Sequence, residues 1–400
     1  MRFCMVTTFY PPFHFGGDAL YVKSLSEALS ALGHHVEVIH CEDAFNTVNH
    51  AKKTIKPQPE TKVKVHRLKS HLGLLSTLYS QQTGRLGSKK KKIKAILSQK
   101  FDVVHFHNIS LVGGPEVLHY SNAPINLYTL HEHWLVCPTH ILWKNNEYAC
   151  DTPDCFRCVL KSGIPPQMWR YTSTLKKALT SIDLFLSPSK FTAEQHKKLN
   201  IDDRIKVLPL FSNLSPKPCK IQKTPRPVFL FVGRVTKSKG IISLLKVMCS
   251  RTDCDVLVIG EGDCLAELIL EYGSCNHISF LGHIEQKELI KLYQNSTALI
   301  LPSLAPETFG LTIVEAFSCG TPVIVKDSGG CSEIVAGSGA GFIYQNDDEL
   351  IAAIEQMSDP KIRKELSIKA RALYEKKYTL KKHLSHYLAI IENIQKEKGI

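Results

Sequence analysis

Strand-like and helix-like segments alternate along this chain, in two successive series. In the first series, short apolar runs predict strands at residues 2–8, 35–40, 63–68, 103–107 and 125–130. Apolar residues at helical spacing predict a helix over residues 18–32, and Gly33 ends it. Alternating β and α segments favour a parallel sheet that is covered by helices. The chain is therefore expected to be an α/β protein.

A second series follows residues 213–227, a segment with four prolines and no apolar periodicity, which is typical of an interdomain linker. Strands are predicted at 228–232, 256–259, 277–281, 298–301 and 322–325, and helices at 240–248, 265–272, 286–294, 312–319, 348–357, 360–377 and 380–398. A chain of 400 residues exceeds what one hydrophobic core usually organises. We therefore expect two doubly wound, Rossmann-like domains, at 1–212 and 228–378. The C-terminal helix within 379–400 is expected to pack back on the first domain.

Positive charge is concentrated in one section of the chain. The sequence has 50 Lys and Arg against 37 Asp and Glu, a net charge of +13. Residues 44–101 hold 14 of these bases and one acid, Glu60, so this section carries the whole excess. No recognition helix or base-stacking motif accompanies it, which argues against nucleic acid. An apolar run at 72–79 beside the lysines at 89–92 suits an anionic membrane surface, and a solvated lysine-rich loop and helix is the alternative.

Cellular location is indicated by what the sequence lacks. No run reaches the roughly 18 apolar residues of a membrane-spanning helix, and the N-terminus shows no apolar signal segment with a cleavage site. The 13 cysteines are odd in number and scattered, which is typical of reduced thiols. We expect a cytoplasmic protein, with peripheral attachment at the inner face of the membrane as a further hypothesis.

Four cysteines cluster in a polar, loop-like stretch: Cys137, Cys150, Cys155 and Cys158. The last two have the spacing C-x2-C, and four thiolates can close a tetrahedral structural zinc site. Two interpretations stay open, a structural zinc ion and four unconnected thiols. The segment Asp253-Cys254-Asp255 resembles a metal-binding D-x-D motif, but it precedes a predicted strand, where such residues commonly form a turn. We assign no metal there.

The most informative stretch covers residues 301–330, LPSLAPETFGLTIVEAFSCGTPVIVKDSGG. Glu307 lies in a loop after a predicted strand, and Glu315 follows eight residues later in a predicted helix. Carboxylates at this spacing can face one crevice, where backbone amides at the helix start add affinity for anions. A sugar nucleotide needs both groups, for its vicinal hydroxyls and its phosphates. A solvated pair of acids is the alternative.

Basic and glycine-rich turns follow other predicted strands. Arg234 and Lys239 place two cations beside a strand end, which suits a diphosphate leaving group. Gly16 and Gly17 precede the helix over 18–32 and would let the backbone approach a phosphate. Taken singly, these segments also fit a solvated basic turn and a simple tight turn.

Taken in series, the segments resemble the retaining glycosyltransferases of family 4, which have the two-domain GT-B architecture. The resemblance covers nearly the whole chain, in the family's order: PPFHFGGDALYVKSLSEALSALGHHVEVI, VVHFHN, TLHEHW, LSPSKFT, FVGRVTKSKG, VIGEGD, ISFLGHI, the E-x7-E block and DSGGCSEIV. It implies that a sugar moves from a UDP- or GDP-sugar to a saccharide or lipid-linked acceptor, in cell-surface polysaccharide or glycolipid synthesis. The first domain would bind the acceptor and the second the donor, with no cofactor for catalysis.

The resemblance also implies roles for single residues. Arg234 and Lys239 are expected to stabilise the departing diphosphate in a front-face displacement. Glu307 is expected to hold hydroxyls of the donor sugar, and Glu315 those of the ribose. The further donor-binding residues that it implies are Gly16, Gly17, His107, Gly233, Glu261, Gly262, Leu281, Phe309, Gly310 and Leu311.

Two pairs of histidines lie at strand ends in the first half, His105 with His107 and His131 with His133. His131 matches the family position whose histidine touches the donor sugar near the reacting carbon, and His107 is the second candidate. The next residue is Glu132, where the family usually has Asp.

The sequence also bears on three other functions. The near-complete motif set argues against a sugar-nucleotide epimerase of the same fold. The short chain argues against a large sucrose-type synthase. An inactive GT-B binding subunit would be expected to lose Glu307, Arg234 or Lys239, and all three are present.

Overall fold

The computed structural model describes residues 1–48, 61–212, 214, 216 and 226–400. Most of the predicted linker at 213–227 therefore lies outside the described residues, as do Lys52, Lys53, Lys56 and Glu60 of the basic section. The chain forms two compact units. Unit 1 comprises residues 1–140, 154–208 and 384–400, and unit 2 comprises residues 141–153 and 209–383.

Unit 1 is built on a parallel sheet with the strand order β3-β2-β1-β4-β5-β8-β9. Its strands are β1 (Arg2–Val6), β2 (His35–Cys41), β3 (Lys64–Leu68), β4 (Val103–Phe106), β5 (Ile125–Thr129), β8 (Leu184–Ser187) and β9 (Ile205–Val207). The five strands predicted from the sequence are confirmed. The prediction missed β8 and β9, which are only four and three residues long.

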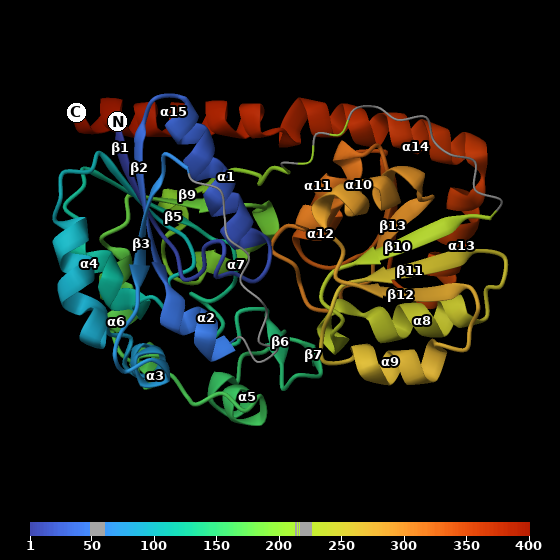
Figure 1. The fold of residues 1–400 in the computed structure, drawn as a ribbon, viewed down its shortest axis with the longest axis horizontal. Coiled ribbons are helices and arrows are strands. Elements are labelled where there is room, and N and C mark those ends of the chain that lie inside the picture. Colours follow the sequence, from blue (N-terminus) through green and yellow to red (C-terminus); the bar gives the residue numbers. More distant parts are fainter. Residues whose placement is uncertain (49–60, 213, 215, 217–225) are drawn as a thin grey trace. The chain divides into compact units, whose positions relative to one another are not determined.

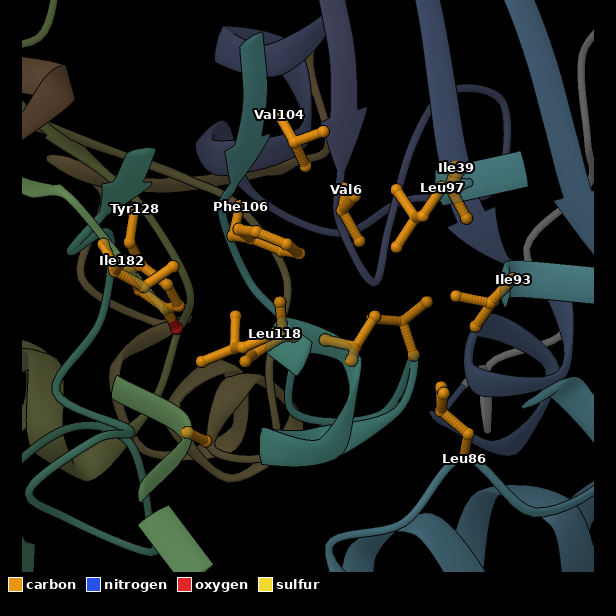
Figure 2. Close-up of a cluster of buried hydrophobic side chains, with 14 of the residues drawn as sticks. Val6, Ile39, Leu86, Ile93, Leu97, Val104, Phe106, Leu118, Tyr128 and Ile182 are labelled. Atoms are coloured by element: carbon orange, nitrogen blue, oxygen red, sulfur yellow. The ribbon is translucent and has the colours of Figure 1, made fainter. Parts of the chain in front are cut away.

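Helices cover the sheet of unit 1 (Figure 1). They are α1 (Gly17–Ala31), α2 (Glu42–Val48), α3 (Leu74–Thr83), α4 (Lys90–Leu97), α5 (Cys155–Lys161), α6 (Thr174–Leu179) and α7 (Lys190–Lys197), with 3-10 turns η1 (Gly87–Lys89), η2 (Gly114–Tyr120), η3 (Met168–Tyr171) and η4 (Asp202–Arg204). Figure 2 shows Val6, Val104 and Phe106 from the central strands pointing toward Leu97 of α4 and Leu118 of η2. All five side chains are buried, which fixes α4 and η2 against the sheet.

Unit 2 contains a second parallel sheet, in the order β12-β11-β10-β13-β14-β15. Its strands are β10 (Val228–Val232), β11 (Asp255–Ile259), β12 (Ile278–Gly282), β13 (Ala298–Leu301), β14 (Val323–Lys326) and β15 (Gly341–Tyr344), and a small hairpin pairs β6 (Trp143–Lys144) with β7 (Tyr148–Ala149). Its helices are α8 (Ile241–Cys249), α9 (Leu265–Tyr272), α10 (Gln286–Asn295), α11 (Leu311–Ser318), α12 (Gly330–Val335), α13 (Asp347–Ser358) and α14 (Pro360–Leu373), with the 3-10 turn η5 (Lys237–Lys239). The helix predicted over 360–377 ends earlier, at Leu373, and continues as a π-helical turn, η6 (Tyr374–Tyr378).

The last helix, α15 (Leu380–Lys398), belongs to unit 1 from Leu384 onward. The hydroxyl of Tyr387 lies 3.0 Å from Nδ1 of His105 on β4, and both side chains are buried. Lys398 donates to Asp183 at 2.6 Å. The C-terminal segment is therefore an integral part of the first unit.

Each sheet places its first strand in the interior, so the strand order reverses between β1 and β4 in one sheet and between β10 and β13 in the other. Ligands of doubly wound folds bind beyond the carboxyl ends of the strands at such reversal points. The predicted fold class is confirmed. In each unit, a ligand site is expected at the carboxyl ends of the strands beside the reversal point.

Candidate functional site

The loop between β13 and α11 carries Glu307, whose carboxylate is held in place before any ligand binds. Oε1 of Glu307 forms an ion pair with Nζ of Lys239 and accepts a hydrogen bond of 2.7 Å from the hydroxyl of Ser303. Burial alone would raise the pKa of Glu307, but the Lys239 ammonium, the Ser303 hydroxyl and the Arg234 guanidinium together lower it. Glu307 is therefore a charged, oriented carboxylate at neutral pH.

Two glycines allow the loops of unit 2 to pack backbone against backbone. Gly240 follows Lys239, and a Cβ atom there would lie 1.9 Å from the carbonyl oxygen of Pro302. Gly329 has a φ of 63°, and a Cβ atom there would lie 2.5 Å from the carbonyl oxygen of Glu307. The loops after β10, β13 and β14 can come this close only because both positions lack a side chain. This packing places Lys239 beside Glu307.

Glu315 lies on α11, eight residues after Glu307 in the chain. Its Oε2 accepts a hydrogen bond of 3.2 Å from the hydroxyl of Tyr293, a fully buried residue of α10. Burial raises the pKa of Glu315 to about 7, although the Tyr293 hydroxyl opposes the shift. Without a ligand, Glu315 is thus close to half-protonated at neutral pH, in contrast to Glu307.

The other residues predicted in unit 2 lie at the carboxyl ends of neighbouring strands. The turns after β10 and β11 are joined by a hydrogen bond of 2.9 Å from the Val235 amide to the Glu261 carbonyl. Arg234 and Glu261 are exposed, and Leu281 at the end of β12 is partly exposed. The Phe309 ring is buried against Tyr378, with 6.0 Å between the ring centroids, so only its backbone could contact a ligand.

The start of α11 matches the expected anion-binding turn. Gly310 precedes the helix with a φ of 104°, and Leu311 begins it. The amides of the first turn point out of the helix end, where they can bind a phosphate.

In unit 1, two of the four strand-end histidines come together. Nδ1 of His107 and Nε2 of His131 are 3.0 Å apart, so one ring donates a hydrogen bond to the other. The edge of Tyr21 on α1 contacts His131, with 4.9 Å between the ring centroids. Burial, together with the neighbouring His105 and His131, holds the pKa of His107 well below its usual range. His107 is therefore neutral.

The other two histidines form hydrogen bonds or ring contacts with further residues of unit 1. His105 contacts the hydroxyls of Thr129 and Tyr387. His133 stacks on His196 of α7 with 5.7 Å between the ring centroids. The His105 ring also packs against His107, with 4.0 Å between the ring centroids, so His105 borders the His107–His131 pair while His133 packs against α7.

The diglycine lies at the start of α1, as predicted. Gly16 precedes the helix with a φ of 78° and is exposed. The sequence prediction did not include Asp18, which follows the two glycines and forms a side-chain hydrogen bond with Asn108. Burial raises the pKa of Asp18 to about 6, and the charge of Glu132 adds to the shift. An acid directly after a diglycine at a helix start was the available signal.

Glu132, the residue that departs from the family pattern, is also held in place. Its Oε2 lies 2.8 Å from Nδ1 of His140. Asp18 and Glu132 thus interact electrostatically in unit 1, and the charge of Glu132 favours the protonated form of Asp18.

The four clustered cysteines divide between the units, with Cys150 in unit 2 and the other three in unit 1. Burial and the nearby Cys137 raise the pKa of Cys155. Among the described residues, no group of three or more His, Cys, Asp or Glu side chains is arranged to hold a metal ion. The structure thus offers no preformed site for the zinc ion, which stays a prediction. Likewise, none of the described helices is long and apolar enough to cross a membrane.

Two Rossmann-like sheets with these loops define a GT-B glycosyltransferase, and comparisons with known proteins agree. Residues 15–215 match the family described as Glycosyltransferase Family 4, and residues 217–373 match the glycosyl transferases group 1. The chain belongs to glycosyltransferase family 4.

Similar proteins extend over nearly the full chain. An uncharacterized glycosyltransferase of Methanocaldococcus jannaschii is 27% identical over 380 residues, covering 88% of this chain and 87% of the relative. The structure of sucrose-phosphate synthase from Thermosynechococcus elongatus superposes with a TM-score of 0.72 at 19% identity, covering 98% of both chains. Anabaena HepE in complex with UDP-glucose gives 0.65 at 17% identity, covering 98% of this chain and all of HepE. At these identities the two structures show the shared fold.

Proposed function

We propose that this glycosyltransferase moves a sugar, with retention of configuration, from a nucleoside diphosphate sugar to a saccharide or lipid-linked acceptor. The observation that carries the proposal is the fixed Lys239–Glu307 pair, with Ser303 and Arg234, at the carboxyl end of the second sheet. This arrangement offers cations and an oriented carboxylate side by side. A sugar diphosphate requires both.

Unit 2 supplies the donor-binding groups in this proposal. Lys239 and Arg234 neutralise the diphosphate as it departs, which is electrostatic stabilisation of developing charge. The charged Glu307 accepts hydrogen bonds from hydroxyls of the donor sugar. Glu315 accepts them from the ribose once it has lost its proton, and the amides at the start of α11 bind a phosphate.

The nucleotide is proposed to be UDP or GDP. The complex of HepE with UDP-glucose supports UDP as the first to test. A ligand that binds only the folded protein raises its melting temperature at saturating concentration. A thermal-shift series with UDP, GDP and their sugars would therefore identify the base, and no shift with any of them would contradict the proposal.

Unit 1 is proposed to bind the acceptor, with His131 near the reacting carbon. His131 and the neutral His107 share one hydrogen bond, so their two rings orient each other. Because His107 stays uncharged, its ring adds no positive charge where the sugar hydroxyls would bind.

Transfer is tested by following nucleoside diphosphate release and the anomeric configuration of the product by NMR. Glu307→Gln keeps the shape of the side chain and removes its charge, so turnover should fall by about 100-fold or more. The matched control is Glu288→Gln, an exposed acid on α10. Equal turnover in wild type and Glu307→Gln would sink the assigned site, and an inverted product would contradict retention.

A further inference from the structure

Helix α3 presents its apolar side chains to the outside and its polar ones to the interior. Ser76, Thr77 and Ser80 are buried, and among the described residues no hydrogen-bond partner lies near Oγ1 of Thr77 or Oγ of Ser80. The exposed side includes Leu75, with an exposed fraction of 64%, and Leu78. A surface helix in water normally has the opposite arrangement. The outer side of α3 is therefore suited to contact something apolar.

A second exposed apolar segment adjoins α3, although it is about 80 residues away in the chain. The indole nitrogen of Trp169 on η3 donates to the carbonyl of Gln81 at 2.9 Å, and the Gln82 side chain donates to the carbonyl of Pro165 at 3.4 Å. These bonds join α3 to the segment that contains α5 and η3 (Figure 1). Together the two segments expose an apolar face: Leu72, Leu74, Leu75, Leu78, Tyr79, Phe156, Leu160, Met168 and Tyr171. A face of this extent on one protein is typical of an interaction site.

The segments around the apolar face are strongly basic. Residues 61–101 contain eleven Lys or Arg and no Asp or Glu, and residues 155–182 contain five and none. Arg85 and Lys161 are exposed next to the apolar side chains in sequence, whereas the exposed Arg157 lies 3.9 Å from the carboxylate of Asp154. Two copies of such a face would repel each other, whereas an anionic surface would be attracted.

The contacts of the lysines at 89–92 limit which of them could bind a membrane surface. Lys89 is buried and donates to the Leu111 carbonyl at 2.9 Å, Lys90 pairs with Glu116 at 2.9 Å, and Lys92 donates to the Arg67 carbonyl at 2.7 Å. The expectation that the cluster at 89–92 forms the membrane contact is therefore too simple, because three of its four lysines already have partners inside the protein.

We propose that the apolar face of α3, α5 and η3 docks this protein on an anionic lipid bilayer. The leucines and aromatic rings insert at the level of the lipid head groups, and Arg85 and Lys161 contact lipid phosphates. The proposal is independent of the reaction proposed above, because it concerns only the surface of unit 1.

Co-sedimentation of the full-length protein with vesicles tests it. Vesicles of phosphatidylcholine with phosphatidylglycerol should bind the protein, and binding should weaken with added salt; pure phosphatidylcholine should bind it far less. Leu75→Ser combined with Leu78→Ser should weaken binding by about tenfold or more. Leu270→Ser is the matched control, because Leu270 on α9 is 88% exposed and lies in unit 2.

A second pair of variants tests the charge. Arg85→Gln with Lys161→Gln should lower affinity by roughly fivefold per residue, while Lys246→Gln with Lys287→Gln, on exposed positions of unit 2, should not. Thermal melts establish that every variant is folded. Three results would overturn the proposal: no binding to anionic vesicles, equal binding by the Leu75/Leu78 variant, or a wild-type dimer that this variant dissociates.

Discussion

Neutralising Glu315 is expected to change how the stability of the protein depends on pH. Burial raises the pKa of this residue to about 7 in the folded protein, against an ordinary value of 4.5. The folded state therefore binds the proton more tightly than the unfolded state. The contribution of Glu315 to the free energy of unfolding is fully present below about pH 4.5 and is lost as the pH rises through about 7. A shift of this size corresponds to roughly 3 kcal/mol.

Urea unfolding of wild type and Glu315→Gln, from about pH 4.5 to about pH 8, measures this loss directly. Because Gln stays neutral, the free energy of unfolding of the variant should rise by roughly 3 kcal/mol relative to that of wild type across this pH range. His40 and His196, whose pKa values burial lowers to about 4, titrate in both proteins and cancel in the difference. Glu288→Gln should follow wild type. Parallel curves for wild type and Glu315→Gln would refute the reasoning.

The same titration connects to the proposed donor site. If the ribose binds the Glu315 carboxylate, nucleotide affinity should fall about tenfold per pH unit below about 7, because the proton must first leave. Calorimetry in buffers of different ionisation enthalpy would detect the released proton. Glu315→Gln should bind more weakly and without this pH dependence.

Three further predictions concern other contacts. Lys239→Met should lower turnover by about 100- to 1,000-fold in the diphosphate-release assay, because it removes a cation from the leaving group. Gly240→Ala should lower the melting temperature sharply, since its Cβ would lie 1.9 Å from the Pro302 carbonyl oxygen, whereas Gly337→Ala, with a φ of 67° but nothing within 4 Å, should cost only about 1 kcal/mol. Tyr387→Phe should lower the free energy of unfolding, measured in urea, by about 1 kcal/mol, because it removes the hydrogen bond between the Tyr387 hydroxyl and His105. A larger loss for Gly337→Ala than for Gly240→Ala, or none for Tyr387→Phe, would contradict these contacts.

Long periodic segments were predictable from the sequence because burial on both faces of a parallel sheet leaves continuous apolar runs. The strand at 228–232 and the helices at 265–272 and 380–398 have the predicted bounds. Strands β8, β9 and β15 were not predicted. Length alone does not explain this, because β4, β13 and β14 also have only four residues and were predicted. Helix α3 could not be oriented from its sequence pattern. The pattern is amphipathic, but the apolar side of the helix faces solvent and the polar side faces the interior.

The candidate site was predictable where loop motifs lie at strand ends, as with Glu307, Lys239 and the diglycine. The partners of these residues were not, because they come from distant positions. Tyr293 is 22 residues from Glu315, and Asp18 forms a hydrogen bond with Asn108, which lies 90 residues further along the chain. Such contacts follow from packing and leave no local pattern in the sequence.

The placement of α15 has a consequence for how the protein is made. Residues 384–400 follow all of unit 2 in the chain, yet they complete the first unit, where Tyr387 reaches the buried His105. Until these residues have been synthesised, β4 lacks one of the elements that pack against it, and unit 1 is incomplete. Co-translational folding of this chain therefore cannot proceed one unit at a time from the N-terminus. Removal of residues 384–400 would therefore destabilise unit 1, which otherwise consists of residues 1–140 and 154–208.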